Sequence, residues 1–280
     1  MVIDTGPVRR LVLTLVAAMA VVSGCTSGSS SDAEPSPSAS TEPAISLASL
    51  DIDWPRATDT LEVGKPPAAP KGFDDGTVAT MADILTTWAR ATTIDQDVWR
   101  SATPVDEVAA ALPAKVGTTL RDQVTGAVSP RLAVANVFAE EATVIGAPQV
   151  TTAWKISTQT DDVGKQYVLL ELQTRAAYEV RLGEGAPTRV IGMLRVHGLS
   201  AYADTTDDFG VTGGWQEFGA SDCALALDDD LIPDTELDET VKGLKTFVQV
   251  GNGEKLSMPT LPVEEQVDSE YLQRCRNSAT

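Results

Sequence analysis

Histidine and cysteine are scarce in this chain of 280 residues, which holds one histidine and three cysteines. The common zinc sites draw most of their ligands from these two residue types, so the composition excludes them. The single histidine, His197, could still serve in a nucleophilic triad, because a triad needs only one. No serine lies in a Gly-x-Ser-x-Gly turn, however, so the sequence offers that histidine no recognisable nucleophile.

Basic residues are also few, with 21 lysines and arginines against 40 aspartates and glutamates, for a net charge of −19. Such a surface repels nucleic-acid phosphates and anionic lipid headgroups, so we exclude DNA and RNA binding. The acidic residues are spread along the chain, which is typical of a solvated surface and is compatible with cationic partners.

The apolar run near the N-terminus, from Leu11 to Val22, is too short for a permanent membrane span, which needs about 20 residues. It follows Arg9 and Arg10, and it ends in the small residues Ser23 and Gly24. A positive start, a short apolar stretch and small residues before a cut site indicate a secretory signal peptide.

This signal is followed directly by Cys25, and Val-Ser-Gly-Cys at 22–25 resembles the lipobox of bacterial lipoproteins, with Val22 in place of the commoner leucine. The resemblance implies that residues 1–24 are removed and that Cys25 becomes a lipid-modified N-terminus. Several acyl chains together anchor a protein stably. We therefore expect a lipoprotein on the extracytoplasmic face of the cell membrane. The alternative is a secreted protein with an incidental cysteine.

Cys223 and Cys275 are the two cysteines that remain once Cys25 is assigned to lipid. An even number of cysteines in an exported protein favours a disulfide. Closing this loop of about 53 residues would contribute on the order of 4 kcal/mol in the chain-entropy model. A metal or redox pair would require close spacing such as Cys-x-x-Cys.

Composition divides the remaining chain into four segments. Residues 25–46 are rich in Ser, Pro and Thr and are predicted to be a disordered tether. Prolines interrupt residues 47–74, which we interpret as an extended strap with Trp54 docking on the domain. Residues 75–222 are predicted to form an α+β domain, and residues 223–280 a C-terminal extension that the disulfide would pin.

Helical signals come first in this domain. Apolar spacing predicts helices over about 76–91 and 114–125, and Thr103-Pro104 predicts a further helix start. After about 138 the apolar period becomes two, which predicts strands over about 150–156, 168–180, 188–202 and 214–219. The longest row places Glu171, Gln173, Arg175 and Glu179 on a wet face. This order favours helices packed on one face of a curved antiparallel sheet.

This plan, with Gly-Gly-Trp-Gln-Glu-Phe at 213–218, is similar to the NTF2-like or cystatin-like cone fold. It is also similar to that of actinobacterial envelope lipoproteins of unknown function. The resemblance covers about 75–222. It implies a cone-shaped cavity between the helices and the sheet, which is catalytic in some members and a binding or docking site in others.

Two groups of residues are candidate sites. His197 shares a strand face with Ile191, Met193 and Arg195, so we expect a packed histidine rather than a catalytic one. Four aromatic residues could line a cavity, although their spacing is more typical of core residues: Trp88, Trp154, Tyr178 and Trp215.

The densest acidic stretch begins at Asp228, and Asp228, Asp230 and Asp234 are weak candidates for calcium ligands. The EF-hand spacing is absent, so a solvated acidic loop is the preferred interpretation. The segment that follows, about 240–250, is predicted to be either an amphipathic helix or an edge strand that packs on the body.

These observations favour a non-enzymatic binding module, or an accessory module of an envelope complex, without a cofactor. Its expected partners are the membrane, through the lipid, and an envelope protein. Two alternatives stay open: a cone-fold enzyme using His197 with a neighbouring carboxylate, and a lipoprotein that binds a small molecule or calcium.

Overall fold

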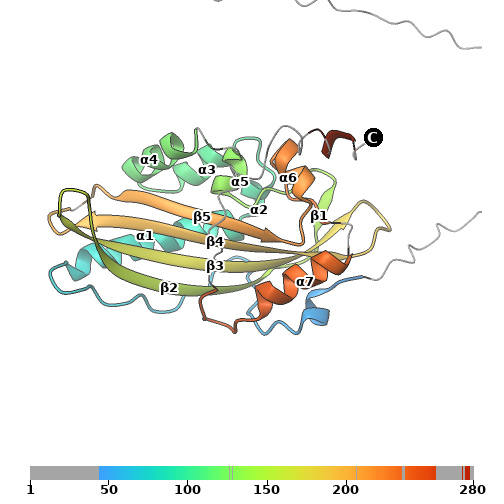
Figure 1. Cartoon of the computed structure of the whole chain (residues 1–280), viewed down its shortest axis with the longest axis horizontal. Coiled ribbons are helices and arrows are strands. Elements are labelled where there is room, and N and C mark those ends of the chain that lie inside the picture. Colours follow the sequence, from blue (N-terminus) through green and yellow to red (C-terminus); the bar gives the residue numbers. More distant parts are fainter. Residues whose placement is uncertain are drawn as a thin grey trace, which may run out of the picture. The chain divides into compact units, whose positions relative to one another are not determined.

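A curved antiparallel sheet of five strands forms the centre of the molecule (Figure 1). Strand β3 is the longest and pairs with both β1 and β2 along one side and with β4 along the other, and β4 pairs with β5. The strands are β1 (Ala142–Val144), β2 (Gln149–Thr160), β3 (Gln166–Leu182), β4 (Arg189–Tyr202) and β5 (Gly210–Phe218). The four predicted strands are therefore confirmed, and β1 is an addition.

The computed structural model describes residues 44–256, except 126, 128, 206, 235 and 236, together with residues 273 and 275–277. All of them belong to one compact unit, Ala39–Thr280. The predicted signal peptide (1–24), Cys25 and the predicted tether up to residue 43 lie outside the described residues.

Five helices cover one face of the sheet, which we call the helix face. They are α1 (Asp75–Thr93), α2 (Gln96–Trp99), α3 (Pro104–Ala110), α4 (Ala114–Val124) and α5 (Pro130–Val134). The side chain of Asp74 caps α1 by accepting from the Thr77 N–H at 2.8 Å, and Pro104 occupies the first turn of α3. The predicted α+β arrangement, with helices on one face of a curved antiparallel sheet, is confirmed.

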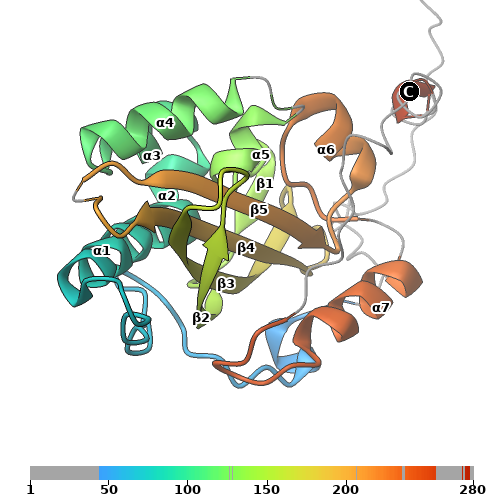
Figure 2. The ribbon, with the colours of Figure 1, turned by 60° about the vertical axis from the view of Figure 1, so that its left-hand side comes forward.

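The opposite face, which we call the outer face, is covered in part. Helix α7 (Leu237–Val248) and the short helix η1 (Leu47–Leu50) lie against it, on the other side of the sheet from α3, α4 and α5 (Figure 2). Together they bury one apolar cluster: Ile45, Leu47, Trp54, Ala177, Val190, Leu194, Phe218, Leu244, Phe247 and Leu256.

The prediction of a wet face is therefore wrong where these segments cover the sheet. Gln173 and Arg175 are buried, and Gln173 exchanges two hydrogen bonds with the backbone of Leu256, at 2.7 and 2.8 Å. The covering segments are distant from β3 in sequence, so the alternation within that strand could not reveal them. The helix predicted over about 240–250 is confirmed as α7, and the alternative of an edge strand is wrong.

Phe247 of α7 lies directly over the backbone of Gly192 in β4. A Cβ atom at position 192 would lie 2.6 Å from Phe247 Cδ1, closer than side-chain atoms pack. The missing side chain of Gly192 thus makes the room in which α7 sits on the sheet.

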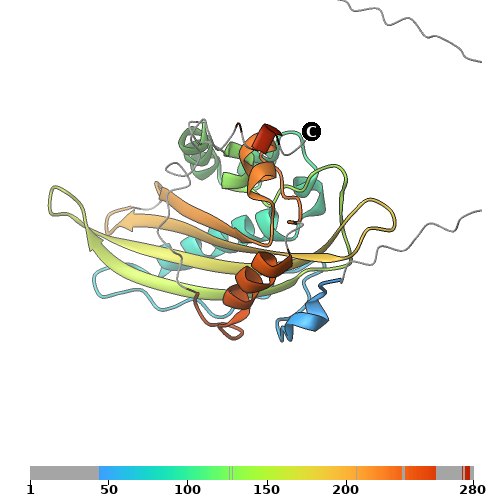
Figure 3. The ribbon, with the colours of Figure 1, turned by 45° about the vertical axis from the view of Figure 1, so that its right-hand side comes forward.

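The strap is ordered from its beginning. Ile45 is buried and its N–H donates to the Thr188 carbonyl at 2.9 Å, so the chain is bound one residue before the predicted end of the tether. Trp54 is buried against the outer face, which confirms its predicted docking. Helix α6 (Asp222–Asp228) follows β5 and carries Cys223 (Figure 3).

Candidate functional site

His197 lies on the helix face of β4, between the sheet and α1. Its Nε2 is 3.0 Å from Thr92 Oγ1, and its ring packs edge-on against Trp88 with centroids 4.9 Å apart. The side chain is 2 % exposed. This is the packed histidine that the sequence predicts, enclosed by α1 on one side and the sheet on the other.

The pKa of His197 is lowered to about 3, because burial disfavours the charged imidazolium and the nearby Arg195 guanidinium repels it. The imidazole is therefore neutral at ordinary pH. The contacts described for this side chain include a threonine and a tryptophan and no carboxylate, so the geometry gives no support to a His197–carboxylate pair.

Arg195, two residues earlier on the same face, organises a buried polar network. Its guanidinium donates to Asn136 Oδ1 at 2.5 Å and to the carbonyls of Leu132 and Ala135, both also at 2.5 Å. Asn136 Nδ2 donates to Tyr178 Oη at 2.6 Å. The Tyr178 hydroxyl in turn donates to the Thr93 carbonyl at 2.6 Å. The network joins α1, α5 and the two central strands.

Burial changes the acidity of both ionisable groups in this network. It lowers the pKa of Arg195 to about 9, although Tyr178 and Asp229 oppose the shift. It also raises the pKa of Tyr178, against the effect of the Asn136 hydrogen bond. The side chains between helices and sheet thus bind one another, which is the behaviour of a polar core.

The four aromatic residues divide into two pairs. Trp88 and Tyr178 are core residues, as predicted. Trp154 and Trp215 are half-buried and pack against the same core, and Trp154 Nε1 donates to the Gly64 carbonyl of the strap at 2.7 Å.

Arg175 is the counterpart of Arg195 on the outer face, and it is 1 % exposed. Its guanidinium donates to four main-chain carbonyls at and after the end of α7: Phe247 at 3.2 Å, Val250 at 2.7 Å, Gly251 at 2.6 Å and Glu254 at 3.1 Å. It also stacks on Trp54, 4.6 Å from the ring centroid. Burial lowers its pKa to about 10, while Glu254 and Asp53 oppose that shift.

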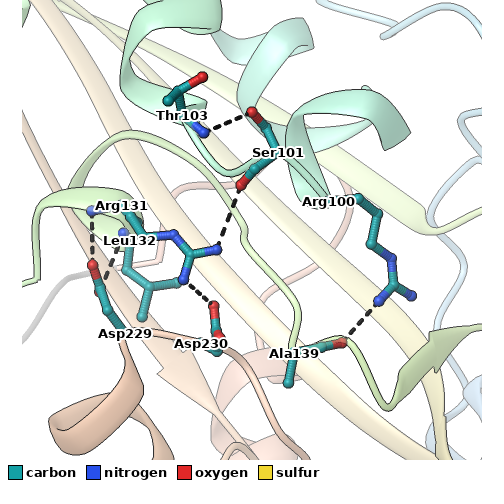
Figure 4. Close-up of polar contacts among 8 residues, drawn as sticks. All are labelled: Arg100, Ser101, Thr103, Arg131, Leu132, Ala139, Asp229 and Asp230. Carbon is teal, nitrogen blue, oxygen red and sulfur yellow. Dashed lines mark hydrogen bonds and ion pairs between the residues drawn. The ribbon is translucent and has the colours of Figure 1, made fainter.

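The acidic stretch after α6 is bound to the helix layer (Figure 4). Asp229 accepts from the N–H groups of Arg131 and Leu132 at 2.8 and 3.4 Å, which caps the start of α5. Asp230 forms an ion pair with Arg131 at 2.7 Å, and the Arg131 guanidinium also donates to the Ser101 carbonyl. Burial raises the pKa of Asp229 and Asp230, and Arg131 opposes both shifts.

The carboxylate of one of the three calcium candidates is committed to an ion pair. Asp230 is committed to Arg131, and the Asp234 N–H donates to the Gly219 carbonyl at 3.0 Å. Within the described ranges, no group of three or more His, Cys, Asp or Glu side chains is arranged to hold a metal ion. The preferred interpretation of a solvated acidic loop is wrong at Asp229 and Asp230, because these two residues bind α5.

The predicted Cys223–Cys275 disulfide is confirmed, with a Cα–Cα distance of 5.1 Å and a sequence separation of 52. It fixes the short helical segment around Cys275 to α6.

Sequence reasoning missed the roles of Arg131, Asn136 and Arg175. Arg195 did carry a signal, because it shares a face of β4 with the apolar residues Ile191 and Met193. Arg175 gave none, since it shares its face of β3 with Glu171 and Glu179, as a solvated residue does.

Comparison with known proteins gives no relative: no family model, no curated protein and no solved structure matches the chain. Among the helices of the described residues, none combines the length and apolar character needed to cross a bilayer.

Proposed function

We propose that this chain is an exported, lipid-anchored protein that acts as a non-enzymatic binding module, serving as an accessory of an envelope complex. The observation that supports this best is the Cys223–Cys275 disulfide, because such bonds persist in oxidising compartments. The bond uses two of the three cysteines and leaves Cys25 at the position where the lipobox resemblance places the lipid.

The buried chemistry supports binding over catalysis. His197 is packed and neutral, and the guanidinium groups of Arg175 and Arg195 bind main-chain carbonyls of the same molecule. Each of these groups holds the fold together. We therefore place the binding function on the surface of the domain, carried outside the membrane by the N-terminal segment.

The test is incorporation of labelled palmitate into the full chain, expressed in a bacterium with lipoprotein processing. The wild-type chain should be labelled, and Cys25→Ala should not be, because it lacks the acceptor thiol. Ser23→Ala is the matched control, since alanine also fits the lipobox at that position, and it should be labelled like the wild type. An unlabelled wild-type chain would refute the anchor.

Thiol alkylation of the same samples tests export independently. Cys223 and Cys275 should resist alkylation until a reductant is added, because both are held in the disulfide. Free thiols at these positions in freshly isolated protein would contradict export to an oxidising compartment.

A further inference from the structure

The two edges of the sheet are treated differently by the rest of the chain. Beside β2, the strap forms hydrogen bonds with main-chain groups that face away from the sheet. The Val150 N–H donates to the Pro55 carbonyl and the Ala57 N–H donates to the Pro148 carbonyl, both at 2.9 Å. Further along, the side chain of Trp154 reaches the strap as well. In the part of the chain that the structure describes, residues 232–234 bond to Gly219 and Ser221 just beyond the end of β5, and β5 itself has no such companion strand or strap.

The register of β5 shows which of its groups point outward. The Val211 carbonyl accepts from Gln123 Nε2 of α4 at 2.7 Å, so it faces away from β4. Inward and outward residues alternate along an antiparallel edge strand, so Gly213 and Trp215 also direct their N–H and C=O groups outward. Across the described residues, the outward main-chain groups of Gly213 and Trp215 have no hydrogen-bond partner.

The approach to these groups is open. Thr212 and Gly213 are exposed, and β5 holds neither a lysine nor a proline, the residues by which proteins commonly block an edge strand. Gly213 has no side chain to obstruct a neighbouring strand. Only glycine fits at this position of β5, because a Cβ atom would lie 2.8 Å from the carbonyl oxygen of Val196 in β4.

Acidic residues lie at both ends of this edge. Asp207 and Asp208 are exposed just before β5, Glu217 lies near its end, and Asp222 begins α6. Of these carboxylates, Asp207 pairs with Lys115 at 3.1 Å. A second copy of this chain, with its net charge of −19, would bring further acidic groups to the edge, whereas a basic segment would complement it.

We propose that β5 is a docking edge for an extended, basic segment of a partner protein, which joins the sheet as a further strand. This inference rests on the proposed binding function and names the chemistry of its partner. Main-chain bonds to Gly213 and Trp215 give the affinity, and basic side chains on the added strand contact the exposed Asp208.

Residue-resolved hydrogen–deuterium exchange on the full-length protein tests this, with a short synthetic peptide of alternating lysine and valine as the probe. The peptide should slow exchange of the Gly213 and Trp215 amides at least tenfold, because strand pairing engages both. The Thr212 and Gly214 amides face β4 and should exchange slowly with or without the peptide. Unchanged exchange at Gly213 and Trp215 would overturn the proposal.

Charge is tested separately. A peptide with glutamate in place of lysine should give no protection, and the double variant Asp207→Asn and Asp208→Asn should bind the lysine peptide roughly threefold to tenfold more weakly. Glu184→Gln, which removes one negative charge in the exposed turn between β3 and β4, is the control and should bind like the wild type. Equal affinity for both peptides would refute the requirement for a basic partner.

The two proposals can fail independently. Absent palmitate labelling with intact protection of Gly213 and Trp215 would refute the anchor and keep the docking edge. Normal labelling without that protection would refute the edge and keep the anchor.

Discussion

Each face of the sheet has a buried arginine, and main-chain carbonyls stabilise the positive charge of both. Arg195 donates to carbonyls at the end of α5, and Arg175 donates to carbonyls at and after the end of α7. Among the described residues, neither guanidinium forms an ion pair with a carboxylate. The carbonyls at a helix C-terminus carry partial negative charge, so the main chain itself stabilises each buried cation.

The difference between the faces lies in what encloses each arginine. Arg195 is surrounded by the helix layer, and burial lowers its pKa further, to about 9, than it lowers that of Arg175, to about 10. Arg175 is covered by a segment that joins the sheet from more than 70 positions away in sequence. We therefore expect the helix face to determine global stability and the outer face to open locally.

Arg195→Met should cause the largest loss of stability. It leaves the Leu132 and Ala135 carbonyls and Asn136 Oδ1 without their donor, at about 1–3 kcal/mol each, so the free energy of unfolding should fall by about 5 kcal/mol. Chemical denaturation measures this. Arg195→Lys keeps the charge but has fewer hydrogen-bond donors. Its free energy of unfolding should therefore lie between those of the wild type and Arg195→Met. A loss below about 1 kcal/mol would mean that the network is dispensable.

His197→Gln should change how the stability of the protein depends on pH, because His197 is buried in the helix face. Between pH 6.5 and about 3 the unfolded chain binds a proton at His197 that the native state does not, so acidification across this window destabilises the wild type. The stability of the wild type relative to His197→Gln should therefore fall by on the order of 4 kcal/mol from pH 7 to pH 3. Denaturation curves at several pH values measure it, and parallel pH profiles would contradict it.

Arg175→Met should loosen the outer face with a smaller loss of about 3 kcal/mol, because water can reach some of the freed carbonyls. Hydrogen exchange should rise over residues 247–256 before it rises in β3. Arg181→Met is the control on the same strand, since Arg181 is exposed, and it should change stability by less than about 0.5 kcal/mol. Uniform exchange across the domain would show that the two faces open together.

Lys115→Met should have the smallest effect, under about 0.5 kcal/mol by thermal or chemical unfolding. Its ion pair with Asp207 spans 3.1 Å, but both side chains are more than half exposed. This variant measures how much stability is lost when a solvated charge is removed, for comparison with the two buried arginines. A loss as large as that of Arg175→Met would remove the contrast between buried and surface charge.

The sequence predicts those features of the fold that depend on neighbours along the chain. The alternation of β3 and Pro104 in the first turn of α3 are local signals, and the structure confirms them. Counting cysteines was enough to predict the Cys223–Cys275 bond.

The contacts that the sequence did not reveal join segments far apart in the chain. Arg175 alternates like a solvated residue, and only the arrival of the segment after α7 buries it. Asp230 meets Arg131 across 99 positions, so an acidic stretch that suggested calcium ligands proved to fasten α5. The docking edge on β5 was equally hidden, because which strand forms an edge depends on the pairing order.

The contact between Gly192 and Phe247 has a consequence for how this protein can evolve. Any side chain at position 192 would occupy the space that the phenyl ring fills, so Gly192 cannot be replaced while that ring is in place. Descendants of this sequence should therefore carry a smaller residue at 247 wherever 192 has gained a side chain. Such paired substitution would record, in sequences alone, that the C-terminal helix has stayed on the sheet.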